Sequence, residues 1–418
     1  MTRFLRRFRR HRTTLGVAWT IILFFFAFAY AMFQGGFVSW FVFYSFLPII
    51  LYTLAVSFYP LSDIEMTREI DKEELYADEP LDVTIEVSRR FLFPLLYLVI
   101  EDHTPENIVK RNSNLKKVAS KGVFSFGFKK RLTFHYTIDG MPRGDYRFKS
   151  VTVKTGDIFG FVQKSKTFDI EQSVLVYPKI IPPQKWTPLD LSFGGRHRSK
   201  KHFEYDLTSI SSIRDYIPGD RLSWLDWKAT ARTSKLVTKQ FEYPINKDIM
   251  VVLDRTINPD DKNGERFERA VSLAASLTDR ALRTGSSVGF ISIGPQAVWV
   301  GMQDQSYQKW VILHHLAAVE PNGEADPSYA FNKYVGQMSH ETTVVFITTK
   351  ISSKMVLLFN DLISRGLAIE MFLAIGDRVP SAEDALLQRL MSMGVYIHLV
   401  RDWRFDEILK AGGSRATS

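Results

Sequence analysis

The sequence predicts three structural regions in order along the chain: two transmembrane helices, a β-sandwich and a doubly wound α/β domain. Two long apolar runs follow the N-terminus, alternating apolar and polar residues come next, and short apolar runs alternate with helical patterns in the C-terminal half. These patterns place a basic segment at 1–14, a transmembrane helical hairpin at 15–59, a β-sandwich at 63–178, a linker at 179–212, a tryptophan-rich segment at 213–246, an α/β domain at 247–402 and a tail at 403–418.

The apolar runs at 15–33 and 37–59 predict the membrane hairpin. As helices they would be roughly 28 and 34 Å long, which is enough to cross the bilayer core. A signal peptide would need one shorter apolar core and a small-residue cleavage site, and the aromatic run Phe24–Phe28 supplies neither. The arginines between Arg3 and Arg12 should stay in the cytoplasm by the positive-inside rule. We therefore expect a multi-pass protein of the cell membrane whose soluble part is cytoplasmic.

Composition excludes several chemistries. The chain has no Cys, which rules out thiol nucleophiles, disulfides and thiolate metal sites. Its net charge of +9 lies mostly in the N-terminal arginine cluster, so it does not by itself indicate a nucleic-acid-binding protein. A second basic run, Arg196–His202, lies in the linker and leaves nucleic-acid binding open as an alternative, although a solvated loop is the simpler interpretation.

Alternation of apolar and polar residues predicts strands at Pro80–Val87 and Arg131–Ile138. Further extended pieces are expected at 144–148, 151–153 and 173–177, and such short strands are typical of an antiparallel sandwich. In the C-terminal half, strands are expected at 248–254, 287–293, 297–300, 342–348, 368–373 and 395–400, with helices at 266–283, 306–319, 352–364 and 382–393. This alternation predicts a mainly parallel sheet.

The first strand of the α/β domain ends in a candidate metal loop. Its residues Asp254, Thr256 and Asn258 resemble the Asp-x-Ser-x-Ser loop with which von Willebrand factor A domains hold a divalent cation such as Mg²⁺. Asn258 would supply an amide oxygen in place of a hydroxyl, and Lys350 follows a later central strand where a cation would be opposed. The alternative interpretation is that Asp254 fastens the turn, with no cofactor bound.

Catalytic signatures are otherwise absent from the sequence. Gly285–Gly289 satisfies Gly-x-Ser-x-Gly, but it follows a predicted helix and precedes a strand, which is the reverse of a nucleophile elbow. No P-loop or strand-linked dinucleotide-binding motif occurs, and no small-molecule substrate is indicated. We therefore expect that the protein is not an enzyme.

The tryptophan-rich segment Ile213–Glu242 combines two tryptophans with alternating charges. With Arg143–Tyr146 and Thr155–Phe161, it makes the chain resemble the bacterial family known as domain of unknown function 58. The matching positions in this segment that we treat as a candidate structural or partner-binding motif are Arg214, Tyr216, Gly219, Asp220, Asp226, Trp227, Lys228 and Arg232. The resemblance implies a von Willebrand A-like domain and association with MoxR-type AAA+ ATPases and transglutaminase-like membrane proteins.

Two accounts of this motif remain open. In one, Tyr216, Trp224 and Trp227 pack against the α/β sheet while the acidic residues pair with neighbouring cations. In the other, the charged groups form an exposed patch that a partner recognises. The leading hypothesis is a membrane-anchored, non-enzymatic scaffold or adaptor that engages protein partners, in line with a MoxR-type ATPase system in cell-envelope maturation. The alternatives are a metal-dependent hydrolase that uses the Asp254 loop and a nucleic-acid-binding protein that uses Arg196–His202.

Overall fold

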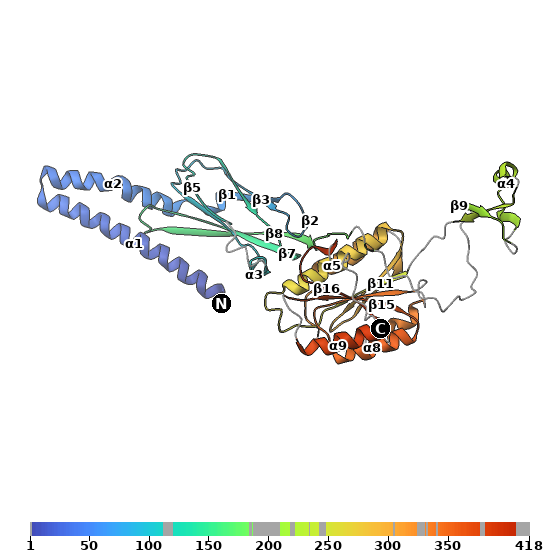
Figure 1. The fold of residues 1–418 in the computed structure, drawn as a ribbon. Helices are drawn as coiled ribbons and strands as arrows, with labels where there is room; N and C mark the ends of the chain where they lie inside the picture. Colours follow the sequence, from blue (N-terminus) through green and yellow to red (C-terminus); the bar gives the residue numbers. More distant parts are fainter. Residues whose placement is uncertain are drawn as a thin grey trace. The chain divides into compact units, whose positions relative to one another are not determined.

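The computed structural model describes two compact units. The first comprises the chain up to Lys179 together with His314–Val319, and the second comprises the rest (Figure 1). The described residues are 2–111, 120–183, 186, 210–217, 222–233, 235–241, 248–303, 306–323, 331, 333–339, 342–376 and 381–406.

The first unit begins with two antiparallel helices, α1 (Thr2–Gln34) and α2 (Phe37–Phe58). Within them, Gly16–Gln34 and Phe37–Phe58 are long and apolar enough to cross a membrane, each with a mean hydropathy of 2.0. The two apolar helices expected from the sequence are thus present, and they suggest a membrane protein. The α1 helix also includes residues 2–14 of the basic segment, which the sequence predicts as a region separate from the apolar run.

Two sheets follow the helices and contribute to one core. The smaller has the strand order β1 (Ile64–Ile70), β3 (Leu81–Arg89) and β6 (Arg131–Ile138), all antiparallel. The larger has the order β2 (Glu74–Tyr76), β8 (Gln163–Tyr177), β7 (Gly144–Gly156), β4 (Leu98–Asp102) and β5 (Lys121–Phe124), and a short helix α3 (Glu106–Arg111) follows β4. Fully buried Val83, Ile85, Tyr146 and Phe148 from both sheets meet in this core, as in a β-sandwich.

A buried ion pair crosses the sandwich core. Arg68 Nη1 lies 2.7 Å from Asp102 Oδ1, and both side chains are fully buried. The other carboxylate oxygen accepts a hydrogen bond from Tyr136 Oη at 2.7 Å, and Arg68 also donates to Gln172 Oε1 and to the carbonyl of Phe148. Every charged atom thus has a partner, which is the condition under which such a pair is tolerated inside a core.

The second unit contains a six-stranded sheet in the order β13 (Val298–Gln303), β12 (Ser287–Ile293), β11 (Asp248–Asp254), β14 (Thr343–Thr348), β15 (Ala368–Ala374) and β16 (Tyr396–Val400). All neighbours are parallel except β13, an antiparallel edge strand. Figure 1 shows α5 (Glu265–Arg283) on one face and α8 (Ser353–Ser364) with α9 (Ser381–Ser392) on the other, and a further helix α6 spans Ser306–Ala318. The doubly wound α/β architecture is therefore present.

Part of the predicted linker is packed against the α/β domain. The backbone N–H of Ile181 donates to Ser276 Oγ at 2.8 Å, and the side chain of Trp186 is almost fully buried. Its Nε1 donates to Glu370 Oε1 at 3.1 Å, and His398 Nε2 lies 2.9 Å from the same oxygen. This first part of the linker is therefore ordered against the α/β domain. The basic run Arg196–His202 lies outside the described residues.

The tryptophan-rich segment forms a small structure of its own. Strands β9 (Ile210–Asp215) and β10 (Val237–Phe241) pair antiparallel. Between them lie a 3₁₀ turn, Leu222–Trp224, and the short helix α4 (Trp227–Thr233). Leu225 and Val237 are buried, which gives this hairpin a minimal apolar centre.

Candidate functional site

The first candidate site lies where the order of strands in the α/β sheet reverses. The chain leaves β11 toward β12 on one side and later returns to β14 on the other side. In open α/β sheets, ligands bind at the carboxyl ends of strands at such a switch point. Asp254 ends β11 and Thr348 ends β14, so both stand at this position.

The carboxylate of Asp254 is held by hydroxyl groups from both sides. Its Oδ1 accepts hydrogen bonds from the backbone N–H of Thr256 at 2.9 Å and from Thr256 Oγ1 at 2.6 Å. Its Oδ2 accepts from Thr348 Oγ1 at 2.9 Å. Burial raises the pKa of Asp254, although the hydrogen bonds from Thr256 and Thr348 oppose that effect.

The hydrogen bonds bring Asp254 and Thr256 together, but they direct the third candidate ligand, Asn258, elsewhere. Asn258 Nδ2 donates to the carbonyl of Thr349 at 2.6 Å, and its Oδ1 accepts from the N–H of Asp260 at 3.0 Å. Hard cations require several oxygen atoms around one centre. Among the described residues no cluster of three or more His, Asp or Glu side chains could hold a metal ion. The oxygen-rich loop of this structure is thus arranged to fasten β11 to β14, and its candidate ligands do not fit a cation as they stand.

The second candidate site is the hairpin β9–β10 with α4. Asp226 is the N-cap of α4, because its Oδ1 accepts from the backbone N–H groups of Lys228 and Ala229, both at 3.0 Å. These bonds lower the pKa of Asp226, and the bond from the N–H of Ala229 has the largest effect. Its own N–H donates to the carbonyl of Val237, and Tyr216 N–H donates to the carbonyl of Leu236. The carboxylate expected to pair with cations therefore positions a helix.

The helix α4 carries an aromatic and basic surface. Trp227, the first residue of the helix, is 68 % exposed, and Lys228 and Arg232 are exposed on the same helix. Trp224 and Tyr216 are half-buried. Of the remaining motif residues, Gly219 and Asp220 lie outside the described residues, and for Arg214 only the backbone is described.

Two residues that bond to the carboxyl ends of the sheet strands were not identified from the sequence. Thr348 is one, and its only signal was a threonine at the end of a strand that neighbours β11. The other is Arg269 of α5, which is buried and donates to the carbonyls of Ile375 and Arg401, just after β15 and β16. An arginine within an apolar helical pattern was the available signal for it.

Comparisons with known proteins agree with the sequence motif. The model of the family described as "Protein of unknown function DUF58" matches residues 212–373, which include α4 and the Asp254 loop. The uncharacterized protein YeaD of Bacillus subtilis (strain 168) is 32 % identical over 391 residues, covering 91 % of this chain and 94 % of the relative.

Likeness to solved structures is weak. An aerotolerance-related membrane protein from Bacteroides fragilis is 14 % identical with a TM-score of 0.27, over 40 % of this chain and 98 % of that one. Proximal thread matrix protein 1 from the mussel byssus is 16 % identical with a TM-score of 0.31, over 40 % of this chain and 47 % of that one. Neither likeness is close enough to carry an argument about function.

Proposed function

Because this chain belongs to the DUF58 family, as its YeaD relative and the family model show, we propose that it is a membrane-anchored, non-enzymatic scaffold. Its α/β domain, which we interpret as von Willebrand A-like, and its α4 hairpin engage protein partners. A MoxR-type AAA+ ATPase that acts in cell-envelope maturation is the partner that we propose to test first. The soluble part faces the cytoplasm in this proposal, where such an ATPase would reach it.

The exposed side chain of Trp227 is the observation that carries this proposal. Tryptophan and arginine are the residues most enriched in protein–protein hot spots, and an exposed tryptophan has a large apolar area to bury. Lys228, Arg232 and Lys235 are exposed around it, so the surface suits a partner that offers an apolar pocket with carboxylates at its rim. Since Asp226 fixes the start of α4, Trp227 is held in place before binding, which lowers the entropy lost on association.

The Asp254 loop supports the non-enzymatic part of the proposal. A general base or nucleophile must reach a substrate, whereas the carboxylate of Asp254 is almost fully buried. Its partners are hydroxyl and backbone groups of the loop itself. In our interpretation the loop keeps the architecture of an adhesion domain and serves to fix the sheet edge.

Affinity purification of the tagged full-length chain from detergent-solubilised membranes tests the scaffold proposal. The matched variants are Trp227→Ala and Trp310→Ala, because Trp310 is another exposed tryptophan, on α6, at 47 %. We expect mass spectrometry to identify an ATPase or envelope protein with the wild type and with Trp310→Ala, and its loss with Trp227→Ala. Recovery of no such partner, or equal recovery with both variants, would refute the proposal.

The metal-dependent alternative has one observation in its favour, which is that Asp254 and two hydroxyl groups meet at the switch point. Calorimetry of the full-length chain with Mg²⁺, Mn²⁺ and Ca²⁺ separates it from the scaffold. Heat of binding that disappears in Asp254→Asn would establish a metal site and favour the metal-dependent hydrolase over the scaffold. We expect no heat with either protein.

A further inference from the structure

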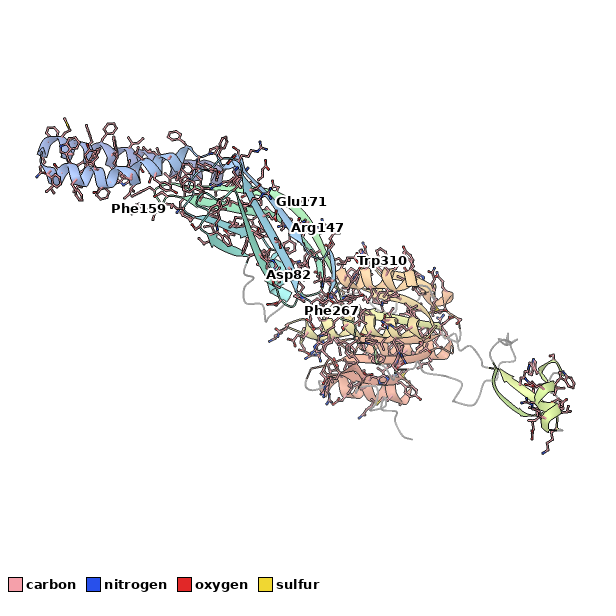
Figure 2. All side chains as sticks on the ribbon, turned by 90° about the horizontal axis from the view of Figure 1, so that it is seen from above. Asp82, Arg147, Phe159, Glu171, Phe267 and Trp310 are labelled. Atoms are coloured by element: carbon pink, nitrogen blue, oxygen red, sulfur yellow. The ribbon has the colours of Figure 1, made fainter. Side chains whose placement is uncertain are left out.

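The end of the β-sandwich from which α1 and α2 extend carries an apolar rim. The rim consists of large side chains from three loops, each between 41 % and 69 % exposed: Phe91, Leu92, Leu96, Phe128, Ile158 and Phe159. The loops connect β3 to β4, β5 to β6 and β7 to β8. Figure 2 shows Phe159 at the end of the sandwich nearest to the helices and Asp82 at the opposite end. Soluble surfaces rarely gather so many exposed large apolar groups in one place.

Hydrogen bonds hold the β7–β8 turn so that its apolar side chains point outward. The buried carboxylate of Asp157 accepts from the backbone N–H of Phe159 at 3.0 Å and from that of Val162. Gly160 has a φ of 76°, a left-handed conformation that favours glycine. Ile158 and Phe159 are thus exposed on an ordered turn.

A buried arginine joins the other two loops. Arg89, at the end of β3, donates to the carbonyl of Phe93 in one loop and to those of Gly127 and Lys129 in the other. Its guanidinium also lies 4.2 Å from the centre of the Phe126 ring. The backbone N–H of Gly127 donates to the carbonyl of Leu95 at 2.7 Å, which adds a direct link.

The same loops contact the membrane helices within the predicted spans. Tyr52 Oη donates to the carbonyl of Pro94 at 3.0 Å and accepts from the N–H of Leu96 at 3.2 Å. Tyr52 lies inside the span Phe37–Phe58, and at 1.5 Å per residue it is roughly 9 Å from the end of that span. The loop therefore reaches the level of the last turns of α2.

Contacts of the β7–β8 hairpin place its turn at the same level. Lys164 Nζ donates to the carbonyls of Ser57 and Tyr59 at the C-terminal end of α2. On α1, a Cβ added to Gly16 would lie only 1.7 Å from the carbonyl oxygen of Phe161, so this glycine allows close approach. Gly16 is the first residue of the α1 span.

We propose that the apolar rim inserts into the interfacial layer of the bilayer that α1 and α2 cross, so that the sandwich lies directly on the membrane. The occupant is lipid because the rim is continuous with the two spans. Aromatic and aliphatic side chains at this depth remove apolar area from water. The exposed cations Lys129, Lys130 and Arg131 stand beside Phe128, where they complement lipid phosphates.

Depth measurements with spin labels test this proposal in the full-length chain, which contains no cysteine of its own. Phe159→Cys and Phe128→Cys would carry the nitroxide on the rim. Leu51→Cys, at an exposed position of α2, serves as the lipid reference. Asp139→Cys serves as the water reference, because it follows β6, whose last residue pairs with Leu81 next to Asp82. The chain is reconstituted at one copy per nanodisc of phosphatidylcholine and phosphatidylglycerol.

We expect both rim labels to collide mainly with oxygen, as the label at Leu51 does, and the label at Asp139 to collide mainly with a water-soluble nickel chelate. Rim labels that match Asp139 while Leu51 reports lipid would overturn the proposal and leave the hairpin intact. Protection of the rim labels from the nickel chelate that appears only when a nanodisc holds two copies would also overturn the proposal. A second chain would then cover the rim. These outcomes are independent of whether Trp227 binds a partner.

Discussion

Thr348 Oγ1 donates a hydrogen bond to Asp254 Oδ2, with 2.9 Å between the two oxygen atoms. This bond joins the ends of β11 and β14, the two neighbouring parallel strands at which the strand order of the sheet reverses. Both side chains are buried, so the bond is made in a medium where an uncompensated carboxylate would be costly.

Asp254 should make the stability of the α/β domain depend on pH. Burial raises the pKa of Asp254 above its ordinary value of 3.8, so the folded chain keeps this proton where the unfolded chain has lost it. Stability contributed by this group therefore falls as pH rises from 3.8 to the folded pKa and stays constant above it. Asp254→Asn has no proton to lose, so its melting temperature relative to the wild type should rise over that range.

Differential scanning calorimetry of the full-length chain in detergent, from about pH 4 to pH 8, measures this difference. Asp248→Asn, at the other end of β11, is the matched control. If the difference in melting temperature between Asp254→Asn and the wild type does not change with pH, the buried carboxylate does not titrate as argued.

The buried pair Arg68–Asp102 should be sensitive to loss of either partner. Arg68→Met leaves Asp102 with only the hydroxyl of Tyr136, so we expect a loss of about 3–5 kcal/mol in the free energy of unfolding of the sandwich. The control is Arg90→Met, which breaks an exposed pair with Glu65 and should cost about 0–1 kcal/mol. Urea denaturation measures both. Similar losses in the two variants would mean that burial of the first pair does not matter.

Trp186 should stabilise the α/β domain through its N–H as well as its ring. Trp186→Phe removes the hydrogen bond to Glu370 and leaves that carboxylate, whose Oε2 is already without a partner, with His398 alone. We expect the variant to lose about 1–3 kcal/mol of stability. Trp403→Phe, at a partly exposed position, provides the comparison in the same denaturation experiment. An unchanged stability of Trp186→Phe would show that this part of the linker does not need its anchor.

Arg89→Lys should loosen two rim loops without removing the charge. A single ammonium cannot match the three carbonyls that the guanidinium reaches in the structure. We expect faster amide exchange in residues 91–96 and 126–130, read by hydrogen–deuterium exchange with mass spectrometry. Arg90→Lys changes the exposed neighbour and should leave both loops protected. Equal exchange in the two variants would show that Arg89 does not join the loops.

The sequence predicted several elements with correct bounds, including strands covered on both faces and β6 (Arg131–Ile138), in which buried and exposed positions alternate. The apolar run Asp248–Asp254 is β11 residue for residue, and Ser287–Ile293 is β12, because strands of a covered parallel sheet are almost uniformly apolar. The expected helix at 266–283 is α5 less its first residue. In each case the apolar residues follow the period of the element, which makes the pattern visible in the sequence.

Strand β8 was predicted only in part for the opposite reason. Its first two-thirds carry Lys164, Lys166, Asp169 and Glu171, and the only apolar alternation before Ser173 is the short one of Phe168 and Ile170, which was not predicted as a strand. Pairing with β7, and not the composition of β8 itself, extends this strand. Such long-range pairing leaves no local signal in a sequence.

The candidate sites show the same division. The sequence identified the Asp254 loop because three oxygen-bearing residues follow a strand. It could not show that Thr348 from another strand would use the carboxylate, or that Asn258 would bind Thr349 and Asp260. Likewise, the charge of Asp226 suggested an ion pair, whereas its position at the start of α4 makes it a cap.

The β7–β8 hairpin has a mechanical consequence. Its ladder runs from Gly144 opposite Val176 to Gly156 opposite Gln163, so at 3.3 Å per residue β7 is about 40 Å long. The turn end is hydrogen-bonded to the C-terminal end of α2 through Lys164 and lies close to α1 at Phe161. A pull along the strands at the far end would be carried by the backbones of both strands to the turn, while the hydrogen bonds between them keep the strands together. The paired strands would therefore transmit such a force to the helices α1 and α2 without separating first.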